Sequence, residues 1–178
     1  MIAALTTTSL VSIDAVALAP ALLPALGVVL VLLGDALLPT RRDWQVGLGI
    51  ATHLVGAAVA VVAAVRAADG PVRTLCRPAP GGACLWTASP TTGTLQAGIL
   101  LSTAAALALL HDRGAGPRDT TVTTALLLAA ATGGAGVAAS RDLGTWLVTL
   151  ELATIPLVAL VALLGTGSAA HGSLALLV

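Results

Sequence analysis

Five long apolar segments, separated by polar connections, limit what this chain can fold into. They cover about residues 15–38, 47–65, 95–110, 121–139 and 143–164. A helix of about 20 apolar residues crosses the roughly 30 Å hydrocarbon core of a bilayer. A sixth segment, 168–178, is too short to span. We therefore predict an all-α, polytopic integral membrane helical bundle with five full transmembrane helices plus the start of a sixth, and a single transmembrane domain over residues 1–178.

The composition supports this fold class and excludes others. Hydrophobic residues make up 57% of the chain and charged residues 9%, too few charges for the surface of a soluble domain. The net charge is zero and the aromatic residues are three Trp, so no basic or stacking surface exists for nucleic acid. All eight basic residues are Arg, and Ala is abundant. This bias is typical of a GC-rich bacterium, and we expect a multi-pass protein of a bacterial plasma membrane.

Glu151 is the only Glu in the chain, and it lies in the middle of the fifth segment. An ionisable side chain at that depth costs roughly 2.5–3.5 kcal/mol on insertion scales, and such residues usually face protein and mark ion or proton paths. Pro156, five residues later, removes a backbone donor and should bend the helix. We predict that Glu151 faces protein and handles protons. The alternative is a protonated carboxyl that only holds helices together, beside a proline used for packing.

The membrane orientation depends on one arginine pair and one cysteine pair. The eight arginines divide equally between the two sides, but the Arg41–Arg42 pair in a short loop favours an extracytoplasmic N-terminus. Cys76 and Cys84 then lie outside, in a long loop of about residues 66–94 with Pro and Gly between them. That spacing favours a disulfide in an oxidising compartment. Two unpaired thiols are the alternative, and no further ligands for a metal lie nearby.

The other ionisable residues are less informative. Asp35, near the end of the first segment, is interpreted as a charge at the membrane boundary. His53 lies inside the second segment, and two readings stay open: a neutral side chain bonded to a neighbouring helix, or a proton relay. No phosphate-binding, dinucleotide-binding or metalloprotease motif is present, so no cofactor or metal site is expected in this chain.

Two stretches resemble a known family. The first stretch begins with Asp142-Leu and continues to Glu151-Leu-Ala-Thr-Ile-Pro156-Leu. The second begins with Ile13-Asp-Ala and continues through Gly34-Asp-Ala-Leu-Leu-Pro39 to the arginine pair. These are similar to the fifth and first helices of subunit N, an antiporter-like subunit of bacterial proton-pumping NADH–quinone oxidoreductase (respiratory complex I). The resemblance implies a membrane-arm subunit that takes part in proton translocation coupled to quinone reduction. It also implies an extracytoplasmic N-terminus.

In that family the glutamate of the fifth helix pairs with a lysine on a later helix, and Glu151 takes that glutamate's position. His171 lies near the position of a family lysine in the sixth helix and could stand in for it. The resemblance implies an enzyme only as a complex, with NADH, flavin, iron–sulfur clusters and quinone in partner subunits, and with other membrane-arm subunits and lipid as partners. Two other functions stay open: a subunit of a multisubunit cation/proton antiporter, and a non-catalytic membrane scaffold.

Overall fold

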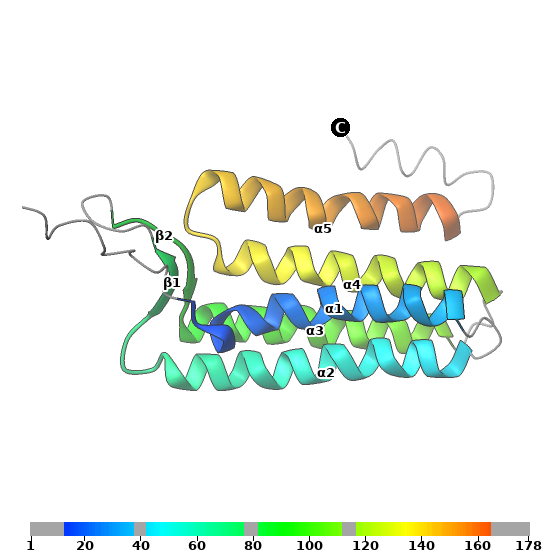
Figure 1. The fold of residues 1–178 in the computed structure, drawn as a ribbon, viewed down its shortest axis with the longest axis horizontal. Helices are drawn as coiled ribbons and strands as arrows, with labels where there is room; N and C mark the ends of the chain where they lie inside the picture. The colour runs from blue at the N-terminus through cyan, green and yellow to red at the C-terminus, as the bar shows by residue number, and fades with distance from the viewer. Residues whose placement is uncertain (1–12, 38–41, 77–81, 112–116, 165–178) are drawn as a thin grey trace, which may run out of the picture.

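A computed structural model describes residues 13–37, 42–76, 82–111 and 117–164 of the chain. It contains five long helices and one β-hairpin (Figure 1). The helices are α1 (Ala15–Leu37), α2 (Arg42–Arg66), α3 (Pro90–His111), α4 (Pro117–Ala139) and α5 (Leu143–Leu164). All five are long and apolar enough to cross a membrane. The predicted fold class is confirmed: this is a polytopic helical membrane protein. The sixth segment, 168–178, lies outside the described residues.

Side-chain caps explain where the helices begin. Asp14 accepts a hydrogen bond from the Ala17 backbone at 3.0 Å, and Asp142 accepts one from the Thr145 backbone at 2.9 Å. Ser89 does the same for Thr92 at 3.1 Å, with Pro90 as the first residue of α3. Each cap satisfies a backbone donor that the first helical turn leaves free. As a result α3 begins five residues before the apolar segment that we predicted.

The long loop after α2 contains structure that the sequence did not predict. Strands β1 (Val72–Cys76) and β2 (Cys84–Ala88) pair antiparallel. Cys76 is paired with Cys84, and the structure joins them by a disulfide. The hairpin lies across one end of the helices, where Trp86 donates a hydrogen bond from Nε1 to the Ala17 carbonyl at 2.9 Å. We call this the hairpin end.

The helices pack through small residues. Helices α1 to α4 form a bundle, and α5 packs outside it against α4 (Figure 1). A Cβ atom added at Gly133 would lie 2.2 Å from the backbone nitrogen of Ala153, so α4 and α5 touch almost backbone to backbone. Close approach of this kind is typical of helix pairs in membranes. The outer face of α5 keeps large apolar side chains exposed, among them Val148 and Ile155.

Candidate functional site

Glu151 lies midway along α5 and is exposed. The residues of α5 that turn toward α4 include Thr149, Pro156 and Leu160, spaced as one face of a helix. Glu151 follows Thr149 by two positions, which places it about 200° around the helix, on the outer side. No hydrogen bond or ion pair of its carboxylate is found within the described ranges.

Among the described helices Glu151 therefore points away from its neighbour α4, and the expectation that it faces protein stays a prediction. The physical reason is the packing of α5, which uses its small-residue face for α4 and leaves the glutamate on the opposite face. The helix is continuous past Pro156 to Leu164, and a bend there stays a prediction.

His53 is fully buried in α2, with none of its surface exposed. Its Nδ1 lies 2.7 Å from the carbonyl oxygen of Gly49, one turn earlier in the same helix. A carbonyl only accepts hydrogen bonds, so Nδ1 carries the proton and, in the neutral ring, Nε2 is an acceptor. Among the described residues, Nε2 is buried without a hydrogen-bond partner. The expected bond to a neighbouring helix is therefore wrong, because the side chain bonds to its own helix instead.

Asp35 is part of a polar cluster that joins three helices at the end opposite the hairpin. Gln45 of α2 donates from Nε2 to Asp35 Oδ1 at 3.1 Å. Thr121 of α4 has its hydroxyl oxygen 3.0 Å from the same carboxylate oxygen and 2.7 Å from Gln45 Oε1. Gln45 and Thr121 are almost completely buried. The interpretation of Asp35 as a simple boundary charge is therefore wrong.

The hydrogen bonds of this cluster depend on one proton. The Thr121 hydroxyl has a single hydrogen, yet its oxygen lies within hydrogen-bond distance of two acceptors. When the hydroxyl donates to Gln45, the contact with Asp35 becomes a full hydrogen bond only if the carboxyl is protonated. When Asp35 is ionised, one of the two contacts is left without a hydrogen. The Thr121 hydroxyl can therefore donate to Asp35 or to Gln45, but not to both at once.

His53 lies on the same face of α2 as Gln45 of this cluster. Gln45, Gly49 and His53 follow one another at four-residue spacing, so they share a face of α2. A Cβ atom added at Gly49 would lie 2.7 Å from the Thr124 methyl group, which places α4 directly against this face. Thr124 is fully buried. We call Asp35, Gln45, Thr121, Thr124 and His53 the buried polar line; from Gln45 to His53 it covers about 12 Å of helix.

Comparisons with known proteins bear on what these residues do. No protein-family model matches the chain. Over 155 residues, 84% of its length, the chain is 39% identical to NADH-quinone oxidoreductase subunit N 2 of Streptomyces griseus subsp. griseus. The chain is similar to subunit N over most of its own length. The resemblance predicted from the sequence is thereby confirmed. The chain spans 27% of the length of that relative.

The similarity to subunit N gives no test of individual site residues. Glu151 lies on the exposed face of α5, whereas His53 is buried in α2, so the structure does not bring the two side chains together. His171 lies outside the described residues. Among the described side chains no group of three or more His, Cys, Asp or Glu could hold a metal ion. Sequence reasoning missed Gln45 and Thr121, although both are polar residues at the edge of an apolar segment.

Proposed function

We propose that this chain is a membrane-arm subunit of a NADH–quinone oxidoreductase. The observation that carries the proposal is the similarity to subunit N over 84% of the chain. Five helices able to span a membrane fit a subunit of the membrane arm. NADH, flavin, iron–sulfur clusters and quinone would then belong to partner subunits.

In this proposal the chain takes part in proton translocation, and Glu151 is its charge-switching carboxylate. Glu151 lies at the middle of a membrane-spanning helix and faces away from the helix that packs against it. An ionised carboxylate in lipid is costly, so a protein neighbour with a cationic group would stabilise it there. We place that neighbour on an element that covers the outer face of α5, and His171 is a candidate for it. Loss of the positive charge of that neighbour would then remove what stabilises the ionised carboxylate.

We further propose that the buried polar line carries protons between the end opposite the hairpin and the interior. Asp35, Gln45 and Thr121 form hydrogen bonds across three helices at that end. Nε2 of His53 is buried and has no hydrogen-bond partner among the described residues, so it can accept a hydrogen bond from a water or a hydroxyl. His53 is thus a relay in this proposal, about 12 Å of helix from Gln45.

Purification of the tagged chain from its native membrane tests the assignment to the complex. We expect it to bring down redox subunits that oxidise NADH, in constant ratio to the chain. A cation/proton antiporter function predicts partners without flavin or iron–sulfur clusters. Recovery of the chain with such partners alone, after solubilisation that keeps the NADH oxidoreductase intact, would contradict the proposal.

A further inference from the structure

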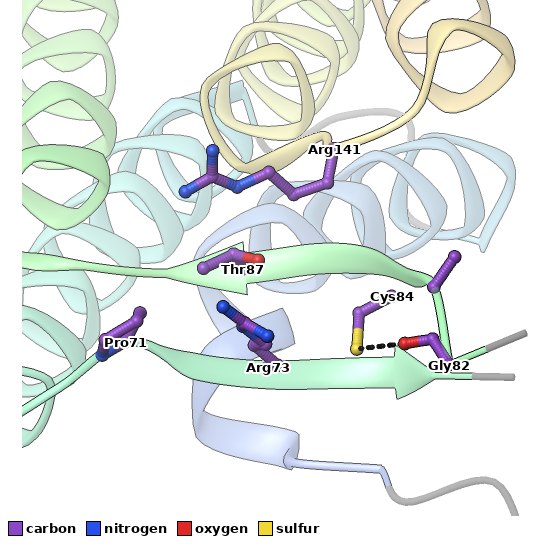
Figure 2. Close-up of a pocket in the computed structure, with 7 residues that line it drawn as sticks. Pro71, Arg73, Gly82, Cys84, Thr87 and Arg141 are labelled. Carbon is purple, nitrogen blue, oxygen red and sulfur yellow. Dashed lines mark hydrogen bonds between the residues drawn. The ribbon is translucent and has the colours of Figure 1, made fainter. Parts of the chain in front are cut away.

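A pocket with a volume of about 310 Å³ opens at the hairpin end. Its walls come from the hairpin and from the turn between α4 and α5 (Figure 2). Arg73 of β1 and Arg141 of the turn both line it, with the buried Thr87 of β2 between them in the view. Arg73 and Thr87 are paired across the two strands. Two guanidinium groups and a hydroxyl therefore share one opening.

Neither arginine forms an ion pair with a carboxylate within the described ranges. The ion pairs found there are Arg66–Asp14, at 3.6 Å, and His111–Asp43, at 3.9 Å. Asp142, next to Arg141, uses Oδ1 to cap α5. Two like charges beside one cavity repel each other, and an anion between them removes that repulsion. An anion in the pocket would therefore meet two exposed positive charges.

The position of the pocket in the fold indicates which anion can reach it. Arg141 lies in the short turn between two helices that can span a membrane, α4 and α5. The turn therefore lies at the height of the lipid headgroups. Just after it Leu143 is 71% exposed and Trp146 is 40% exposed, and an exposed Trp at a helix end is typical of the membrane interface. Headgroup phosphate lies above such apolar side chains, with acyl chains beside them.

We propose that this pocket binds the phosphate of an anionic phospholipid, such as phosphatidylglycerol, in the leaflet at the hairpin end. Guanidinium groups match phosphate oxygens in pairs, so Arg73 and Arg141 supply the main contacts. The Thr87 hydroxyl supplies a further donor. A zwitterionic headgroup binds less well, because its ammonium group meets the same two positive charges.

Lipid binding to the purified full chain tests this. The probes are phosphatidylglycerol, phosphatidylcholine and sodium phosphate, added to the protein in detergent, with retained lipid counted by native mass spectrometry. We expect the chain to retain phosphatidylglycerol in preference to phosphatidylcholine. Arg73→Gln and Arg141→Gln should each weaken that binding roughly tenfold, since a hydrogen bond to a charged group contributes about 1.5 kcal/mol or more. Arg141→Lys should bind phosphatidylglycerol more weakly than the unchanged chain and more tightly than Arg141→Gln.

Arg118→Gln is the matched control, because it removes an arginine at the other end of α4. It should bind phosphatidylglycerol as the unchanged chain does. Equal phosphatidylglycerol binding by the unchanged chain and by a variant that carries both Arg73→Gln and Arg141→Gln would overturn the proposal. A loss of binding in Arg118→Gln as large as in those variants would also overturn it. Sodium phosphate binding as tightly as phosphatidylglycerol, and lost in the same variants, would overturn the lipid as the source. An intact disulfide and an unchanged melting temperature show that each variant is folded.

Discussion

At the scale of single residues, His53 is set apart by an unpaired nitrogen. Nδ1 is bonded to Gly49, while Nε2 is buried with no hydrogen-bond partner among the described side chains. A buried polar atom left unpaired costs about 1–3 kcal/mol. A residue kept only for packing would avoid that cost. The unpaired nitrogen therefore supports the relay function that we propose.

His53→Leu separates packing from proton transfer. The variant removes the unpaired nitrogen and fills the site with a side chain of similar size, so we expect its melting temperature to be unchanged or higher. Proton translocation by the assembled complex should fall if His53 is a relay. His111→Leu is the control, because that histidine is exposed at the end of α3. Unchanged translocation in His53→Leu, at normal assembly, would leave His53 with a packing role alone.

Asp142, which caps the start of α5, makes the stability of the fold depend on pH. Hydrogen bonds from the Thr145 side chain and backbone lower the pKa of Asp142 below its ordinary value of 3.8. The folded state therefore favours the ionised form of Asp142. This stabilises the fold fully above the pKa that Asp142 has in the unfolded chain, and the stabilisation is lost as the pH falls through the lower pKa of the folded state. Asp142→Asn keeps the cap but not the charge. The melting-temperature difference between the two chains should narrow as pH falls below about 3.8; a constant difference would contradict it.

At the scale of elements, glycine determines how closely α4 and α5 approach. Gly133→Ala places a Cβ against the backbone of Ala153, which cannot move as a side chain can. We expect it to destabilise the chain by about 1–3 kcal/mol, as overpacking does. Gly98→Ala is the control, because nothing lies within 4 Å of its added Cβ. It should stabilise α3 by roughly 0.5–1 kcal/mol. Thermal unfolding in detergent measures both, and equal effects would refute the close contact.

The sequence predicts the helices of this fold better than the contacts between them. The apolar segments identify five helices, because the bilayer requires about 20 apolar residues of each. The start of α3 was readable from Ser89-Pro90, a cap followed by a proline, but hydropathy alone missed it. The hairpin was missed because its strands are short and flanked by Pro and Gly. The cluster at Asp35 was missed because Gln45 and Thr121 come from different helices, and hydropathy does not show which helices meet.

At the scale of the whole molecule, the orientation in the membrane follows from the hairpin. The Cys76–Cys84 disulfide lies at the end where α1 begins and α5 begins. Disulfides persist in oxidising compartments, so we predict that this end is extracytoplasmic. After reduction, a membrane-impermeant thiol reagent should label both cysteines in intact cells. Labelling only in inverted vesicles would contradict the predicted orientation.

Glu151→Gln tests whether the charge of Glu151 takes part in proton translocation. The amide keeps the shape of the side chain and its hydrogen-bonding capacity but removes the charge. In inverted vesicles energised with NADH, we expect proton uptake and coupled quinone reduction to fall strongly while assembly stays normal. Asp43→Asn, which removes a carboxylate that is 99% exposed at the start of α2, should change neither. Normal proton uptake in Glu151→Gln, together with failed assembly in Glu151→Ala, would contradict the claim and assign Glu151 a structural role.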